Sequence, residues 1–291
     1  MGLEIQTKAV QLKDGTQKFS FSGDVGAYVY GLSGFDVSYS DGSDHHLEIF
    51  EIVLQANQPS KNEIHVTPTI KFSDASGKSA GSNSYITISV VAWIGDDADR
   101  NVSMNNAIDL GSASFNTGST AYFGQAVQAG WDLSYGSKDH HVLSMSASTG
   151  LQLSGTTATL SGTAAMADND GNMATTATVN AGYLASLQSD PGFGVQITKI
   201  DGYGTGQTAT FDFGQDVDQV AVFLLGYDLS YGSGKDHHIQ EVALGQWGSS
   251  KIGVSGSTAT VNVSVIFQDT SNPPHTATTH TLDLVAIGRY K

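Results

Sequence analysis

Apolar and polar residues alternate along much of this chain, which is typical of strands with one buried face. The alternating stretches are residues 9–21, 107–123 and 195–213. Short apolar runs that fit buried strands are Val90–Ile94, Asn180–Leu184 and Leu284–Ile287. Clusters of Gly, Asn, Asp and Ser separate these stretches, and no helical period is sustained over about ten residues. The pattern predicts an all-β protein built from antiparallel β-sandwiches.

One motif occurs three times, and each copy runs from Gly–aromatic–Asp to Asp–His–His. The copies are Gly34–Leu47, Gly130–Val142 and Gly226–Ile239. Their first aspartates, Asp36, Asp132 and Asp228, lie 96 residues apart. Because this period matches one small domain, we predict three tandem antiparallel β-sandwich repeats of about 96 residues. The predicted segments are 1–97, 98–190 and 191–291, with boundaries where turn residues cluster.

Composition narrows the function classes. The chain has 13 Lys and Arg against 28 Asp and Glu, a net charge of −15, so we expect no nucleic-acid partner. It has no cysteine, which excludes disulfides, thiolate zinc sites and cysteine nucleophiles. The first residues lack the basic and apolar regions of a signal peptide, so we expect synthesis in the cytosol. Release by a non-classical route stays open.

Six of the nine histidines stand in the three Asp–His–His groups. If each motif forms a hairpin, strand alternation places Tyr39 near His45, and His46 on the outer face with Asp36. A second aspartate follows downstream in each segment, in a predicted turn. The candidate ligand-binding residues are therefore Asp36, His45, His46, Asp74, Asp132, His140, His141, Asp168, Asp228, His237, His238 and Asp269.

Three interpretations of these residues stay open. In the structural one, the downstream aspartates accept turn amides, the first histidine packs beside the tyrosine, and the second covers the sheet or an inter-segment contact. In the others, the groups bind a ligand or a divalent metal. Adjacent strand residues point to opposite faces, so a metal site needs histidines from neighbouring segments. We expect no other cofactor.

Other motifs are weaker. Asp168–Asn172 resembles the start of a calcium loop, but the twelfth position is Val179 instead of a bidentate Glu, so a β-turn is favoured. No Ser/His/Asp set distinguishes itself from the repeated residues. A catalytic centre repeated three times in near-identical form would be unusual, so we expect no enzyme.

The unit resembles the H-type lectin domain, the six-stranded sandwich of snail agglutinin and of the C-terminal part of discoidins. The pieces that carry the resemblance in the third segment are Phe223–Leu229, His238–Ala243, Thr258–Thr270 and Thr281–Gly288. The resemblance covers roughly two thirds of each unit. It implies binding of galactose-type sugars, largely N-acetylgalactosamine, at the seams of a trimer.

Two family positions differ. The family's arginine falls at the histidine pairs, and its aromatic position falls at Phe72, Met166 and Phe267. We therefore do not carry over the family's sugar specificity. The geometry implied by the resemblance is a pseudo-threefold body made by three units of one chain.

These observations favour a non-enzymatic, lectin-like protein that binds glycan or a cell-surface receptor through triplicated Asp/His sites. One alternative is a pore-forming or insecticidal-type toxin with a membrane partner, because the Ser/Thr/Gly/Ala-rich run Ser144–Gly182 alternates as membrane-inserting hairpins do. The same run also fits ordinary sandwich strands. Another alternative is a structural or assembly protein, a fibre, shell or coat subunit, in which the histidine pairs mediate homo-oligomer contacts.

Overall fold

Strands make up nearly all of the regular structure in the computed structural model, which describes residues 2–95, 101–232, 236–248, 250–271 and 274–291. The first eleven strands are β1 (Gly2–Gln11), β2 (Gln17–Ser20), β3 (Val25–Ser38), β4 (Ile49–Ser60), β5 (Glu63–Ser73), β6 (Tyr85–Ile94), β7 (Val102–Leu110), β8 (Ser112–Asn116), β9 (Phe123–Ser134), β10 (Ser144–Ser154) and β11 (Thr157–Ala167). The others are β12 (Thr176–Ser186), β13 (Phe193–Asp201), β14 (Gly204–Asp212), β15 (Val217–Ser230), β16 (Glu241–Gln246), β17 (Gly253–Ser255), β18 (Thr258–Gln268) and β19 (Thr279–Tyr290). One short 3₁₀ helix, η1, covers Leu12–Asp14. Within the described ranges, no helix has the length and apolar character needed to cross a membrane.

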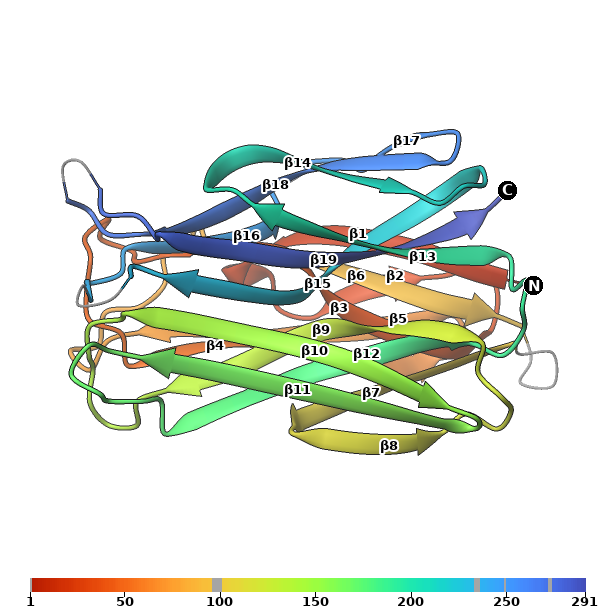
Figure 1. Ribbon diagram of the computed structural model, residues 1–291, viewed down its shortest axis with the longest axis horizontal. Coiled ribbons are helices and arrows are strands. Elements are labelled where there is room, and N and C mark those ends of the chain that lie inside the picture. Colours follow the sequence, from red (N-terminus) through yellow and green to blue (C-terminus); the bar gives the residue numbers. More distant parts are fainter. Residues whose placement is uncertain (1, 96–100, 233–235, 249, 272–273) are drawn as a thin grey trace.

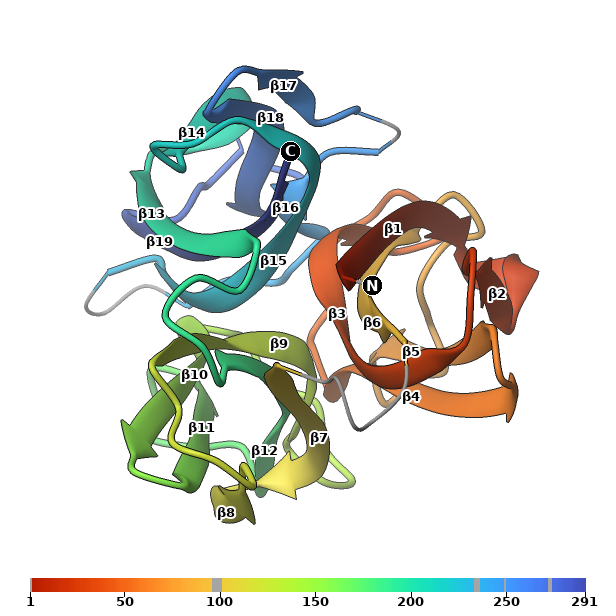
Figure 2. The ribbon, with the colours of Figure 1, turned by 90° about the vertical axis from the view of Figure 1, so that its right-hand side faces the viewer.

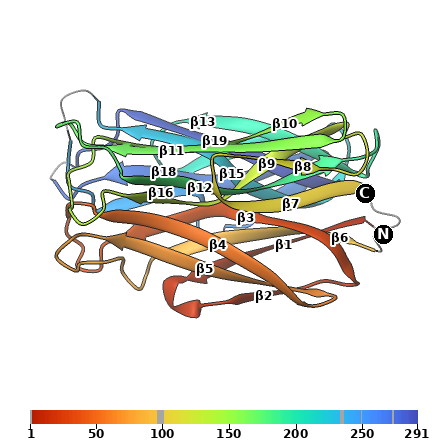
Figure 3. The ribbon, with the colours of Figure 1, turned by 90° about the horizontal axis from the view of Figure 1, so that it is seen from below.

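The strands form three antiparallel sheets, which confirms the predicted all-β class. Their strand orders are β1-β6-β3-β16-β18-β14 with β17 on β18, β13-β19-β15-β10-β11-β8, and β2-β5-β4-β9-β12-β7. The strands run along the long axis of the body (Figures 1 and 3). Seen from one end, they form three groups around a common centre (Figure 2). Both termini lie at the right-hand end of Figure 1.

Each sheet contains strands from two of the predicted segments. The joining pairs are β3 with β16, β4 with β9, and β10 with β15, and each pair aligns five residues on either strand. We call these three junctions the seams. Consequently, each segment contributes strands to two sheets, and each of these two sheets is completed by a different neighbouring segment. The predicted boundary at residues 97 and 98 lies outside the described residues, and the division into three segments stays a prediction.

The glycine of each repeated motif lies at a seam, and at two of the three seams the partner strand leaves no room for a side chain. Gly130 has a φ of +139°, and a Cβ added there would lie 1.8 Å from the backbone oxygen of Ile52. A Cβ on Gly34 would lie 2.4 Å from the backbone nitrogen of Gln246. Side chains are therefore excluded at these points, which explains why the motif begins with glycine.

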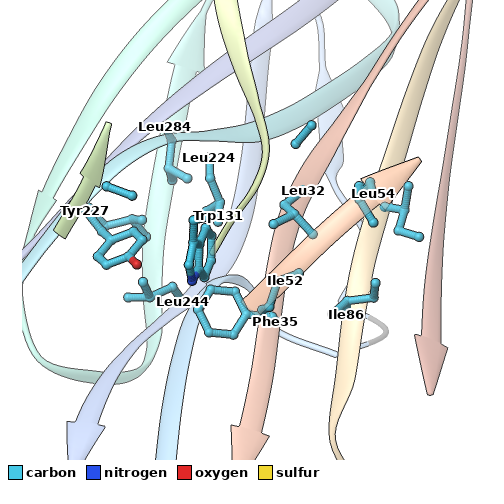
Figure 4. Close-up of a cluster of buried hydrophobic side chains, with 14 of the residues drawn as sticks. Leu32, Phe35, Ile52, Leu54, Ile86, Trp131, Leu224, Tyr227, Leu244 and Leu284 are labelled. Carbon is cyan, nitrogen blue, oxygen red and sulfur yellow. The ribbon is translucent and has the colours of Figure 1, made fainter. Parts of the chain in front are cut away.

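The core lies at the centre of the body, where the three groups of strands meet. Phe35, Trp131 and Tyr227, the aromatic residues of the three motifs, are buried together. The Trp131 ring lies between the other two, with centroid distances of 5.2 Å to Phe35 and 5.1 Å to Tyr227 (Figure 4). Aromatic pairs at these distances pack favourably beyond the area that they bury. The three motifs thus supply one shared core.

The predicted hairpin is wrong. β3 and β4 belong to different sheets, because β3 pairs with β6 and β16 whereas β4 pairs with β5 and β9. The chain between them, residues 39–48, crosses from one sheet to another. Alternation within each strand indicated which residues are buried, but it carries no information about which strand lies alongside.

Candidate functional site

Backbone hydrogen bonds join the three histidine-bearing connections into a closed ring. In each junction, the first histidine of one connection exchanges two N–H···O bonds with the apolar residue that follows the second histidine of another. The pairs are His45 with Ile239, His140 with Leu47, and His237 with Val142, with N···O distances of 2.9–3.2 Å. Because side chains alternate along extended chain, the buried Leu47, Val142 and Ile239 and the intervening second histidines point in opposite directions.

The second histidines of the three pairs, His46, His141 and His238, therefore meet, and we call them the three-histidine cluster. Their ring centroids lie 4.5–4.6 Å apart. The three side chains are 40–43% exposed, so one side of the cluster faces solvent. Burial, followed by repulsion from His46 and His141, lowers the pKa of His238. Each predicted segment contributes one ring to this contact.

An aspartate from a neighbouring segment lies behind each ring of the cluster. His46 Nδ1 is 3.6 Å from Asp139 Oδ1, and Asp139 Oδ2 accepts the backbone N–H of Ala75 at 3.2 Å. In the same way, His141 faces Asp236, which accepts the backbone N–H of Asn169. His238 faces Asp44, which accepts the backbone N–H of Thr270. These aspartates precede the histidine pairs in the sequence and were not among the candidate residues. The sequence signal was their place in the repeated Asp–His–His motif.

The first histidines occupy a different environment, beside a tyrosine of their own segment. The His45 ring lies 4.7 Å from Tyr39, as predicted, and its Nδ1 is 3.2 Å from Asp74 Oδ2. The corresponding sets are His140 with Tyr135 and Asp168, and His237 with Tyr231 and Asp269. These contacts agree with the structural interpretation of the first histidines.

The buried downstream aspartates accept hydrogen bonds from their own turns. Asp168 Oδ1 accepts the backbone N–H groups of Asp170 and Asn172 at 2.9 and 2.8 Å. Burial alone would raise the pKa of Asp168, but these hydrogen bonds, the Asn172 amide and His140 outweigh it, so the pKa is lowered. Asp74 and Asp269 have the same balance in their turns. The Asp168–Asn172 stretch is thus a turn organised by its first aspartate.

Asp36, Asp132 and Asp228 lie at the seams and not beside the histidines. Among the residues that the structure describes, none of these three forms an ion pair with a histidine, so the expected association of His46 with Asp36 is wrong. The reason is the crossing between sheets after β3. Asp36 pairs in register with Tyr85 and Ala243, and burial raises its pKa. Burial and then Asp36 also raise the pKa of the nearby Glu241.

A groove at the seam of β3 and β16 contains residues that the sequence did not single out. Its lining consists of Tyr85, Trp247, Gly248, Ser250 and Asn262, and its volume is about 430 Å³. We call it the Trp247 groove. The Trp247 side chain is 48% exposed, although large aromatic side chains are usually covered. The Tyr85 hydroxyl accepts the Gly248 N–H at 2.7 Å, which ties the first segment to the third.

The other two seams lack this aromatic pair. By strand register, the places of Tyr85 and Trp247 are taken by Thr178 and Gln55 at the seam of β4 and β9. At the seam of β10 and β15 they are taken by Thr281 and Gly150. A position-by-position alignment of the three segments would have singled out Trp247, because the equivalent residues, Gln55 and Gly150, are not aromatic.

Comparison with protein-family models and with curated proteins gives no match for this chain. Its function is therefore inferred from the chemistry of the three-histidine cluster and of the Trp247 groove.

Proposed function

We propose that this protein is a non-enzymatic, lectin-like recognition protein, and that it binds glycan in the Trp247 groove. The observation that carries the proposal is the half-exposed Trp247 beside Tyr85 and Asn262 at a seam. An exposed indole face stacks on the apolar face of a pyranose ring, while amide and hydroxyl groups bind the sugar hydroxyls. The groove has the volume of a small-ligand site.

The position of the groove also supports the proposal. Tyr85 comes from the first predicted segment, whereas Trp247 and Asn262 come from the third. The resemblance to H-type lectins implies sugar binding at seams between units. Two carboxylates, Asp36 and Glu241, lie close enough to Tyr85 to raise its pKa, after the larger effect of burial.

A glycan array followed by titration of the best glycan tests the proposal. We expect binding by the wild-type protein, and a loss of about tenfold or more in affinity for Trp247→Ala, equal to about 1.4 kcal/mol. Tyr122→Ala is the matched control, because Tyr122 is 61% exposed and is not part of the groove lining. An array without hits, or equal affinities of Trp247→Ala and wild type, would contradict the proposal.

The two alternatives stay predictions. The run Ser144–Gly182 proposed for a toxin forms β10, β11 and part of β12. β10 is hydrogen-bonded between β11 and β15, as an ordinary sheet strand is. The assembly alternative uses histidine pairs between chains, whereas the second histidines contact one another within one chain.

A further inference from the structure

The three-histidine cluster has the composition and spacing of a metal site. His46, His141 and His238 each offer one ring nitrogen, and these three atoms lie within 4.8 Å of one another. Bonds of about 2.0–2.1 Å in a tetrahedral site place ligand nitrogens about 3.3 Å apart, so small ring rotations suffice to close the cluster. We propose that the cluster binds one divalent transition-metal ion of the Zn²⁺ class per chain.

The aspartates behind the rings select the ligand atom. Each Nδ1 of the cluster faces a carboxylate at 3.6–3.8 Å, as His46 does with Asp139, which leaves Nε2 for the metal. A carboxylate behind a metal-bound histidine fixes the ring orientation and increases its basicity. The aspartates are held in turn by backbone N–H groups of the downstream turns, at 3.2–3.4 Å.

The backbone fixes the cluster before any ion arrives. Each ring belongs to a residue flanked by two members of the closed hydrogen-bonded ring, so its Cα position is determined on both sides. The exposed side of the cluster leaves room for water or another small ligand to complete the coordination. Imidazole nitrogens favour Zn²⁺, Co²⁺, Ni²⁺ or Cu²⁺, whereas Ca²⁺ and Mg²⁺ favour oxygen ligands.

A second group of possible ligands, His237, Asp269 and His275, is better explained by the turn that contains it. His275 Nδ1 lies 2.6 Å from Asp269 Oδ2. In the second segment, the Asn172 side-chain amide donates to Asp168 Oδ2 in the same way. Because an amide can replace the imidazole at this place, His275 acts as a hydrogen-bonding group of the turn. It therefore provides a histidine control outside the proposed site.

Titration with the metal alone tests the proposal, independently of any glycan. Protein treated with EDTA and returned to chelator-free buffer is titrated with Zn²⁺ by calorimetry and with Co²⁺ by visible absorption. We expect one ion per chain, no comparable binding of Ca²⁺ or Mg²⁺, and a higher midpoint of thermal unfolding with Zn²⁺. Failure of wild-type protein to bind Zn²⁺ or Co²⁺ would overturn the metal site and leave the glycan proposal untouched.

Variants assign the ligands. We expect His141→Ala to weaken Zn²⁺ binding by at least about 100-fold, and Asp139→Asn by about 10–100-fold. His275→Ala is expected to stay within about twofold of wild type. Circular dichroism checks the fold, and Asp139→Asn keeps the side-chain shape if His141→Ala does not fold. Wild-type Zn²⁺ affinity in both His141→Ala and Asp139→Asn would assign the ion elsewhere and overturn the site. Loss of Zn²⁺ binding in His275→Ala would do the same.

Discussion

The three segments carry nearly the same residues at the histidine end of the body. At the seams, their residues differ. At the histidine end, each segment supplies the same tyrosine, two histidines and downstream aspartate. At the seams, Asp36, Asp132 and Asp228 face three different residues, Ala243, Glu51 and Ser146. The unchanged residues join the segments to one another, whereas the changed residues give each seam its own surface chemistry.

The largest expected effect comes from breaking a feature that all three seams share. Gly130→Ala places a Cβ against the Ile52 carbonyl at a φ that other residues avoid, and we expect it to lower the free energy of unfolding by more than about 3 kcal/mol. Denaturant unfolding measures the change. Gly111→Ala is the control, because its added Cβ meets no atom within 4 Å. Equal stabilities of the two variants would show that the seam tolerates a side chain.

A smaller effect is expected at the histidine end, where the turn aspartates act. Asp168→Asn replaces an acceptor of backbone N–H groups, and we expect a loss of about 1–3 kcal/mol at pH 7. Because the folded pKa of Asp168 is lowered, its stabilisation is present above the unfolded pKa of about 3.9 and is lost as the pH falls through the folded pKa. The difference from wild type should therefore shrink towards pH 2 in thermal unfolding. Asp170→Asn, at an exposed side chain of the same turn, is the control, and we expect its stability at pH 7 to stay close to that of wild type.

The smallest effect is expected from replacing one glutamate at each of two seams and comparing the changes in stability. Burial and Asp36 raise the pKa of Glu241, so stability is lost as the pH rises above the unfolded pKa of about 4.3, and the loss is complete above the folded pKa. Glu241→Gln should therefore raise stability at pH 7 by about 0.5 kcal/mol and leave it unchanged near pH 3. Glu51→Gln should give no gain, because Glu51 forms an ion pair with Lys71. A shift of the same sign in both variants would show that the two seams are electrostatically alike.

Much of the fold could be predicted from local pattern. Alternation and short apolar runs predicted strands that are now found within β6, β12 and β19, and the turn aspartates and the contact of Tyr39 with His45 were expected. These features depend on residues close in sequence or on burial of one strand face. The pairing of strands between segments could not be predicted, because the sequence of β16 indicates a buried strand and not which strand lies alongside it.

The candidate site was predicted only in part for the same reason. The histidines were found by repetition, and the need for neighbouring segments was recognised from strand alternation. Their actual contact depends on bridges such as His45 with Ile239, which join residues far apart in the chain. Trp247 is not part of the repeated motif, so repetition did not point to it. Its exposure results from the end of β16 and the turn that follows.

The pairing of β3 with β16 has a consequence for how the chain reaches its folded state. Phe35 aligns with Leu244, which is synthesised roughly two hundred residues later. Until then, one edge of β3 has unpaired backbone groups, and such an edge can recruit strands of other chains. Contacts between residues so distant in sequence also slow folding, because the loop must close before they contribute. We therefore expect a newly made chain to be most prone to aggregation before its last third emerges.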